Sequence, residues 1–191
     1  GGETHSRHLL GMVEKAVRLA LGGLEHVDVV VVSQGPGSFT GLRIGMGTAK
    51  GLAMGLGRPL VGVSSLEALA YQCAEAPALL LPLIDARHRE VYVGRFRSAA
   101  GGLQAVAPEA VAAPEAAVAG VREPCLMVGD GARAYAERLL KATAPFGRLA
   151  PPEAHTIRAA SLGFLALRRL AAGERLQNAA RLAPRYLRGA D

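Results

Sequence analysis

The chain has 191 residues, of which 50% are hydrophobic and 4% aromatic, with no tryptophan. A chain of this length can form one large domain or two small lobes, with a core of Ala, Leu and Val that needs no disulfide or metal. The low content of aromatic rings argues against platforms that stack single-stranded nucleic acid. The formal net charge of +6 permits contact with RNA or an acidic partner but requires neither.

The first part of the chain predicts helices that alternate with buried strands. The expected helices cover 6–21, 39–56 and 64–75, and the expected strands cover 26–32 and 60–63. Apolar residues at spacings of three and four mark the first helix, with Ser6 as its cap. The unbroken valine run 29–32 is typical of a strand covered on both faces of a sheet. Ser64 or Ser65 suits the cap of the third helix.

The second part predicts a β-hairpin and then a further strand, turn and helix. The expected strands cover 79–84, 90–96 and 125–128, and the expected helices cover 132–142 and 156–172. Residues 85–89 suit the hairpin turn between the first two strands. The stretch 98–120 is so rich in Ala, Gly and Pro that it predicts no regular element.

A strand, a glycine-rich turn and a helix occur twice, over 29–56 and over 126–140, which indicates a weak internal duplication. We therefore expect two lobes that meet near Pro77, residues 1–76 and 77–191, with the C-terminal tail packing back on the first lobe. Equivalent lobes would have a hairpin before the first copy as well. No such hairpin is present, and the chain opens with Gly1-Gly2 rather than Met.

The most distinctive segment is the turn and helix start over 35–43, Gly-Pro-Gly-Ser-Phe-Thr-Gly-Leu-Arg. A glycine-rich turn between a buried strand and a helix presents backbone N–H groups at the positive helix end, as phosphate-binding loops do. The spacings of a Walker A loop and of a Gly-x-Gly-x-x-Gly site are both absent. Two interpretations stay open: a structural turn, and a phosphate loop made of Gly35, Gly37, Ser38 and Thr40.

Glycines recur every four residues in the helix after this turn, in one series from Gly41 and in another from Gly47. Each interior glycine costs about 0.5–1 kcal/mol relative to alanine, so the pattern indicates close approach by another element. That element is either part of the same lobe or a second chain. In the second case the candidate partner-binding residues of the two helices are Leu9, Met12, Val13, Gly41, Ile44, Gly45, Met46, Gly47, Gly51 and Leu52.

The chain offers no evident catalytic or metal-binding set. His5 and His8 lack a third ligand nearby, which favours solvated helix-end residues over a metal site. Ser38 has no recognisable base, and no Gly-x-Ser-x-Gly elbow occurs. We therefore expect no catalytic residue, no metal and no cofactor.

The two cysteines and the hydropathy pattern point to the cytoplasm. Cys73 and Cys125 lie in separate apolar stretches without Cys-x-x-Cys spacing, which favours buried free thiols in a reducing compartment. No apolar run reaches the eighteen or so residues that span a bilayer, and no charged leader precedes a hydrophobic stretch. We expect neither a membrane protein nor a secreted one.

Several segments together resemble the bacterial TsaB (YeaZ) family, the partners of the TsaD enzyme in making threonylcarbamoyladenosine beside the anticodon of tRNAs that read codons beginning with A. The matching segments follow the order of the family and cover 34–45, 49–53, 61–66, 84–87, 90–92, Pro184 and 186–188. The Gly-Pro-Gly-Ser-Phe-Thr-Gly block is the most specific of them.

The resemblance implies an α/β fold of the actin-like, sugar-kinase-like (ASKHA) class, with two duplicated lobes, mixed sheets and flanking helices, in which the first N-terminal hairpin is missing here. TsaD-type proteins carry a Gly-Val-Asn-His-x-x-x-His segment whose histidines bind a metal. The similar stretch here has Ser65 and Leu69 at those positions. The resemblance thus implies a non-catalytic scaffold that binds and stabilises TsaD, helps to recruit TsaE and forms a homodimer when alone.

Two other functions remain open: a nucleotide-binding enzyme of the same fold that uses 35–40 as its phosphate loop, and a metal-dependent peptidase of the M22 glycoprotease type. Six arginines near the C-terminus suit either a solvated face or a weak tRNA contact; they are Arg168, Arg169, Arg175, Arg181, Arg185 and Arg188.

Overall fold

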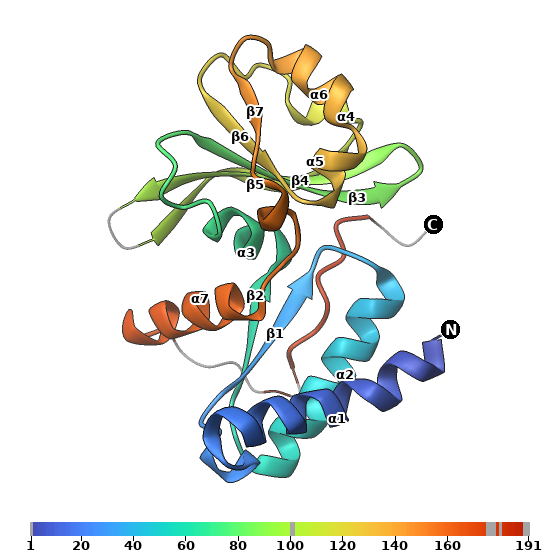
Figure 1. Ribbon diagram of the computed structural model, residues 1–191, viewed down its shortest axis with the longest axis vertical. Coiled ribbons are helices and arrows are strands. Elements are labelled where there is room, and N and C mark those ends of the chain that lie inside the picture. The colour runs from blue at the N-terminus through green and yellow to red at the C-terminus, as the bar shows by residue number, and fades with distance from the viewer. Residues whose placement is uncertain (1, 100–101, 175–178, 180, 189–191) are drawn as a thin grey trace.

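The computed structural model describes residues 2–99, 102–174, 179 and 181–188 (Figure 1). The N-terminal part contains α1 (Gly2–Leu21), the 3-10 turn η1 (Leu24–His26), β1 (Val30–Gly35), α2 (Phe39–Leu56), β2 (Leu60–Ser64) and α3 (Ser65–Tyr71). Strands β1 and β2 are parallel and joined through α2, and a register shift occurs near the end of β1. The helix predicted over 39–56 is therefore confirmed, as is Ser64 as the cap of α3, where its hydroxyl accepts from Leu66 N–H and Glu67 N–H.

The second sheet has five strands in the order β5-β4-β3-β6-β7. Its strands are β3 (Leu79–Arg87), β4 (Glu90–Ala99), β5 (Gly102–Ala112), β6 (Cys125–Val128) and β7 (Gly147–Leu149). The pairs β3–β4 and β4–β5 are antiparallel, whereas β3–β6 and β6–β7 are parallel. The predicted hairpin and the strand over 125–128 are both confirmed. Between and after the strands lie α4 (Pro114–Ala117), α5 (Asp130–Ala134), α6 (Ala136–Thr143), η2 (Pro152–His155) and α7 (Ala159–Ala171).

The two-stranded sheet is covered on both faces because its apolar side chains alternate. Val30 and Leu60 point to one face, where they pack against α2 and against Leu182 of the C-terminal tail. Val63 points to the other face, where it packs against Leu165 of α7. Figure 1 shows β1 and β2 between α2 and α7.

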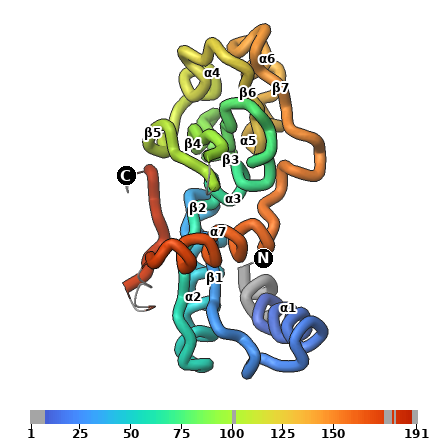
Figure 2. Tube along the Cα trace, turned by 90° about the vertical axis from the view of Figure 1, so that its left-hand side faces the viewer, coloured from blue at the N-terminus to red at the C-terminus, as the bar shows by residue number. Residues whose placement is uncertain are grey.

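Helix α7 and the tail therefore pack with the first sheet, although they follow the second sheet in sequence. Figure 2 shows the tail rising from the level of α7 towards β5. Grouped by packing, these segments belong with residues of the predicted first lobe, although they follow residue 77 in sequence. The predicted lobes, residues 1–76 and 77–191, stay a prediction. The two sheets are connected through α3, whose Leu66 and Leu69 pack under Leu80 and Val128 of the second sheet.

Several predicted elements were wrong in detail. Helix α1 already includes Gly2, so Ser6 is not at its start, and His26 belongs to a 3-10 turn rather than to the strand, which begins at Val30. The helix predicted over 132–142 is two helices that meet at Tyr135. The stretch predicted to be irregular contains β5, and β7 was not predicted. Within the described part of the chain, no helix is long and apolar enough to cross a membrane.

Candidate functional site

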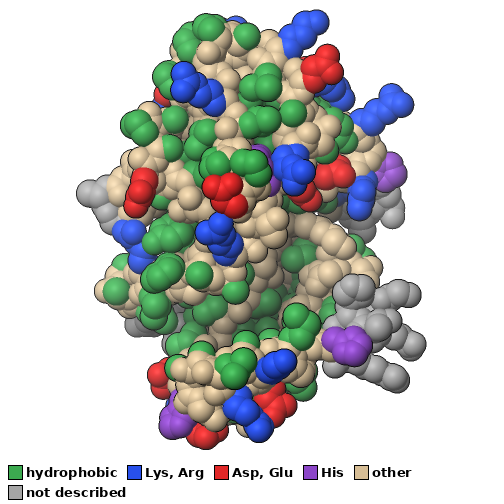
Figure 3. Space-filling view, viewed as in Figure 1, with side chains coloured by type: hydrophobic (Ala, Val, Ile, Leu, Met, Phe, Trp, Pro, Cys, Tyr) green, Lys and Arg blue, Asp and Glu red, His purple; other side chains and the backbone are tan. Residues whose placement is uncertain are grey.

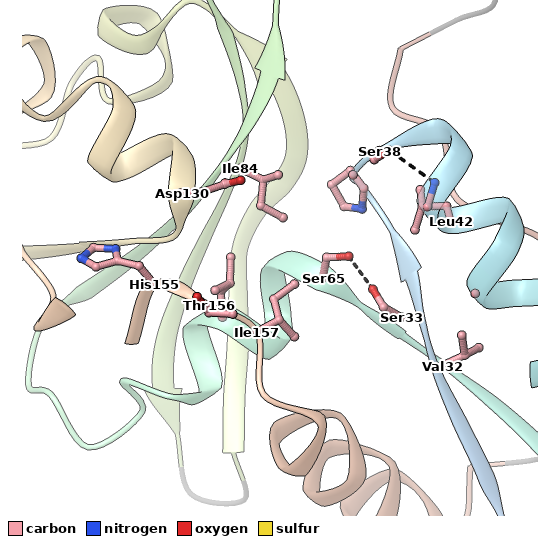
Figure 4. A pocket seen from close by; sticks show the side chains of 15 residues that line it. Val32, Ser33, Ser38, Leu42, Ser65, Ile84, Asp130, His155, Thr156 and Ile157 are labelled. Carbon is pink, nitrogen blue, oxygen red and sulfur yellow. Dashed lines mark hydrogen bonds between the residues drawn. The ribbon is translucent and has the colours of Figure 1, made fainter. Parts of the chain in front are cut away.

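A cleft of about 470 Å³ lies where the two sheets approach each other. One wall comes from β1 and the start of α2, with Val32, Ser33 and Leu42, and the opposite wall comes from the second sheet and the segment after it, with Ile84 and Ile157 (Figure 4). Most of these side chains are apolar. The cleft can accept a small, largely apolar group.

The residues of the predicted phosphate loop are not all brought together in this cleft. Gly37 and Ser38 line it, whereas Gly35 is buried under the tail. A Cβ atom at Gly35 would lie only 2.8 Å from the carbonyl oxygen of Arg185. The hydroxyl of Ser38 already caps α2 by accepting from Gly41 N–H at 3.3 Å. Thr40 is exposed and does not line the cleft. The loop is thus held as a structural turn by its own helix and by the tail.

The charge in the cleft also disfavours a phosphate. Among the described residues that line it there is no Lys or Arg, and the one carboxylate is that of Asp130. Asp130 Oδ1 accepts from Asp85 N–H at 3.1 Å and from Gly131 N–H at 2.8 Å. Polyanions need positive side chains or several free N–H donors, so this lining gives the nucleotide-binding alternative no support.

The serine and leucine that stand where TsaD-type proteins have histidines both line the cleft. Ser65 Oγ lies 2.6 Å from Ser33 Oγ (Figure 4), and Leu69 is buried. The nearby His155 is held by the backbone: Gly129 N–H donates to its Nδ1 at 3.0 Å, and its Nε2 lies 2.9 Å from the carbonyl oxygen of Ala150. In the part of the chain that the structure describes, no three His, Cys, Asp or Glu side chains are grouped to hold a metal.

The second candidate site is a groove of about 410 Å³ between α1 and α2, which pack against each other. The residues that line it are Leu10, Glu14, Leu24, Thr48, Gly51, Leu52, Gly55 and Leu56. Side chains built at Gly45, Gly47, Gly51 and Gly55 would meet nothing within 4 Å. These glycines are therefore not required by packing within the chain. We call this surface the helix-pair groove.

The predicted partner-binding residues divide between this surface, the cleft and the core. Gly51 and Leu52 line the helix-pair groove, and Gly41 and Gly45 line the cleft. On the surface Met12 is 67% exposed and Gly47 is exposed, whereas Leu9, Val13 and Ile44 are partly buried.

The prediction that Met46 contacts a partner was wrong, because Met46 is only 3% exposed and packs in the core with Val30, Ala49 and Leu60. It cannot contact a partner in this structure. The predicted partner-binding residues did not include Leu10 and Thr48, although the spacing of Thr48, Gly51 and Gly55 by three and four residues places them on one helix face.

The six C-terminal arginines do not form one free basic face. Arg169 pairs with Glu67, Arg185 Nη1 lies 3.1 Å from Glu109 Oε2, and Arg188 pairs with Glu90. Arg175 lies outside the described residues. The prediction that both thiols are free and buried is confirmed for Cys73 and Cys125.

The comparisons with known proteins agree on one family. A family model described as tRNA N6-adenosine threonylcarbamoyltransferase, TsaD, matches residues 2–188. The tRNA threonylcarbamoyladenosine biosynthesis protein TsaB of Haemophilus influenzae is 34% identical over 145 residues, which are 70% of this chain and 61% of that protein. TsaB of Escherichia coli is 36% identical over 114 residues, 58% of this chain and 49% of that protein. The matched part thus spans less than two thirds of these relatives.

Solved structures match over most of the chain. YeaZ from Pseudomonas aeruginosa has a TM-score of 0.80 and 34% identity over 95% of this chain and 85% of that one. An uncharacterized protein from the same organism, described as similar to peptidase YEAZ, has a TM-score of 0.81 and 33% identity, and covers 96% of this chain and 84% of that one. The predicted α/β, actin-like fold class is confirmed.

Proposed function

The chain belongs to the TsaD family, and within it to the TsaB (YeaZ) group, and on that premise we propose that it is a non-catalytic subunit in the synthesis of threonylcarbamoyladenosine in tRNA. Its role is to bind and stabilise TsaD through the helix-pair groove and to help recruit TsaE. The observation that carries this proposal is the groove itself, whose glycines face open space in the isolated chain.

The glycines give a partner close access to the backbone of α2. Each interior helix glycine costs about 0.5–1 kcal/mol of stability relative to alanine, and no atom of the described residues lies within 4 Å of a Cβ built at Gly51 or Gly55. A hollow of about 410 Å³ accepts one or two large apolar side chains from a facing helix. A scaffold that packs helix against helix therefore explains glycines that the fold does not need.

The surroundings of the groove combine exposed apolar side chains with charged ones such as Glu14 and Arg18, as is usual in a protein interface. Exposed large hydrophobic side chains on these two helices include Leu10, Met12, Leu19, Leu21 and Met54, with Met54 71% exposed. Figure 3 shows hydrophobic side chains interspersed with charged ones at the lower end of the molecule. Without TsaD, a second copy of the chain offers the same surface, so we propose that the free protein self-associates about a two-fold axis.

The chemistry of the cleft supports a non-catalytic role. Asp130 and His155 are both engaged by backbone groups, and Ser65 is engaged by Ser33. The buried free thiols of Cys73 and Cys125 suit the reducing cytoplasm, where we place the protein.

The test is co-purification of the tagged chain with TsaD from the same genome, followed by addition of TsaE on a sizing column. Gly51→Leu fills the groove and is expected to abolish both complexes while the isolated chain stays folded. Gly163→Leu is the matched control, because Gly163 lies in α7 and also has open space at its Cβ position. Full retention of TsaD by Gly51→Leu, or loss with Gly163→Leu alone, would refute the proposed surface.

A further inference from the structure

Two of the few aromatic side chains lie together on the surface at the start of α2. The ring centroids of Phe39 and Tyr186 are 5.3 Å apart, with 36° between the ring planes. Arg43 lies over the Phe39 ring, with its Cζ 3.9 Å from the centroid, and its Nε donates to the Tyr186 hydroxyl at 3.3 Å. Phe39 is nevertheless 53% exposed and Tyr186 45% exposed. Two aromatic rings and a guanidinium plane are thus presented to solvent.

The tail holds Tyr186 in this position through contacts with both sheets. Arg185 N–H donates to the carbonyl oxygen of Gln34 at 2.7 Å, and Gln34 Nε2 donates to the carbonyl oxygen of Ala183 at 2.9 Å. On the other side of Tyr186, Arg188 pairs with Glu90 at the start of β4. The aromatic pair is therefore pre-organised, which lowers the entropy cost of binding a ligand.

Basic side chains continue from the tail onto the turn between β3 and β4. Glu90, the partner of Arg188, directly follows the exposed residues Arg87, His88 and Arg89. These three non-glycine residues have φ values of 63°, 49° and 63°, a left-handed conformation that is uncommon outside turns and that fixes the course of the backbone between the two strands. Figure 1 shows this turn, the end of the tail and the start of α2 on the same side of the molecule.

The charges on this side are suited to an anionic chain. Arg87, Arg185 and Arg188 each have a carboxylate partner, in Asp85, Glu109 and Glu90. Among the described residues, neither Arg43 nor Arg89 has a carboxylate within 4.0 Å. Arg43 is engaged by Phe39 and Tyr186 instead, so Arg89 is the group on this side best suited to contact a phosphate.

We propose that Phe39, Arg43 and Tyr186, together with Arg89, bind a single-stranded segment of RNA by stacking an unpaired base on this exposed cluster of two rings and a guanidinium and by contacting a phosphate with Arg89. This inference rests on the proposed function, in which tRNA is the substrate of the complex. The aromatic faces distinguish RNA from an acidic peptide, because they carry negative partial charge and repel carboxylates but stack on a flat base.

The surface is separate from the helix-pair groove. Phe39 begins α2, and Gly51 lies twelve residues further along the same helix, which corresponds to about 18 Å at 1.5 Å per residue. A variant of the aromatic pair is therefore expected to leave TsaD binding unchanged, so that the failure of this inference can be told apart from the failure of the scaffold role.

The experiment measures the affinity of the isolated chain for two labelled RNAs by fluorescence anisotropy. One is a hairpin with an unpaired loop, and the other is a blunt duplex with the same number of phosphates. Tyr186→Ala and Phe39→Ala are expected to weaken hairpin binding about five-fold to a hundred-fold and to leave duplex binding unchanged. Tyr186→Phe keeps the ring and is expected to bind as the natural chain does. Arg89→Gln should weaken both RNAs and reduce the salt dependence by about one phosphate contact.

Phe164→Ala is the matched control, because Phe164 is an aromatic residue of α7 that is 56% exposed and lies outside this surface. It is expected to bind both RNAs normally, and melting curves of all variants check that each is folded. The proposal is overturned by equal affinity for hairpin and duplex, by folded alanine variants with unchanged hairpin affinity, or by an acidic peptide that binds this surface and displaces the hairpin. Loss of TsaD binding in Tyr186→Ala with intact hairpin binding would also overturn it.

Discussion

Replacing glycines of α2 by alanine should make the isolated chain more stable and its complex with TsaD weaker. Gly47 and Gly51 lie in the interior of an 18-residue helix, and a Cβ at either position meets nothing within 4 Å. Neither has a left-handed φ, so alanine introduces no backbone strain. Only the helix propensity and the lower entropy of the unfolded chain remain, and both favour alanine.

The size of the effect follows from these terms. Each substitution is expected to add about 0.5–1 kcal/mol to the free energy of unfolding, and the pair about 1–2 kcal/mol. For a chain of this length about 1 kcal/mol corresponds to roughly 2–4 °C in melting temperature, so the double variant should melt roughly 2–8 °C higher. The assay is urea and thermal unfolding at concentrations where sedimentation shows a monomer.

The complex should respond in the opposite direction, because the methyl group of Gly51→Ala occupies space that the facing helix would use. Titration with TsaD should show a larger dissociation constant for Gly51→Ala, which means weaker binding. Gly163→Ala in α7 should instead gain stability without losing affinity for TsaD. The reasoning is refuted if Gly47→Ala and Gly51→Ala destabilise the monomer, since their space would then be filled within the chain. Unchanged affinity of Gly51→Ala and Gly51→Leu for TsaD would refute the role of the groove.

Three further outcomes are expected. Gly129→Ala should destabilise the chain by at least about 1–3 kcal/mol from backbone strain alone. Gly129 has φ +113°, and a Cβ atom there would clash with the carbonyl oxygen of Leu83. Urea unfolding measures the loss of stability, and an unchanged free energy of unfolding would contradict this prediction. Burial raises the pKa of the Cys73 and Cys125 thiols, so a disulfide reagent should label them slowly in mildly alkaline buffer until urea unfolds the chain, and rapid labelling of the native protein would count against this. Burial raises the pKa of Glu67 above its ordinary 4.5 despite the opposing effect of Arg169, so between the unfolded and the folded pKa the folded chain keeps a proton that the unfolded chain has released. The stability from this group is present below pH 4.5 and is lost as the pH rises through the folded pKa; unfolding free energies measured against pH should show that loss, and Glu67→Gln should remove it.

The sequence predicted the elements whose local pattern agrees with their environment. Helix α2 and strand β6 were located at their observed limits, because residue types that favour a helix follow the glycine-rich turn and an apolar run marks the strand. Strand β5 was missed because its residues include four alanines, a glycine and a proline, which have little strand propensity of their own. Its antiparallel pairing with β4 supplies the hydrogen bonds that hold it in the sheet, and such pairing is not visible in a local pattern.

The faces of α2 show what the spacing of small residues leaves undetermined. The glycine series of this helix indicated close approach by another element without saying which face is buried: Ala49 and Ala53 are buried with Met46 in the core, whereas Gly47 and Gly51 are exposed. Met46 belongs with the core because Leu42, Met46, Ala49 and Ala53 follow one another at four, three and four residues. That period was present in the sequence, but the choice of buried face depends on where β1 and the tail lie.

The aromatic pair shows a similar limit of composition. A content of 4% aromatic residues argues against many stacking sites, yet a single site needs only two rings and a cation. Phe39 and Tyr186 are far apart in sequence, and they meet because Leu182 anchors the tail in the core of the first sheet while Arg188 ties it to Glu90 of the second.

Helix α2 connects the two proposed surfaces through a single rigid element. Its core face is fixed by Leu42, Met46, Ala49 and Ala53, so the helix cannot rotate to improve one surface without disturbing its packing on β1. The helix-pair groove lies along its C-terminal half, and the aromatic pair begins at its first residue. A partner seated in the groove and an RNA loop stacked on Phe39 would therefore be held at a fixed spacing. In the proposed scaffold role, the chain would contribute to the modification reaction in this way, by positioning the substrate relative to the enzyme.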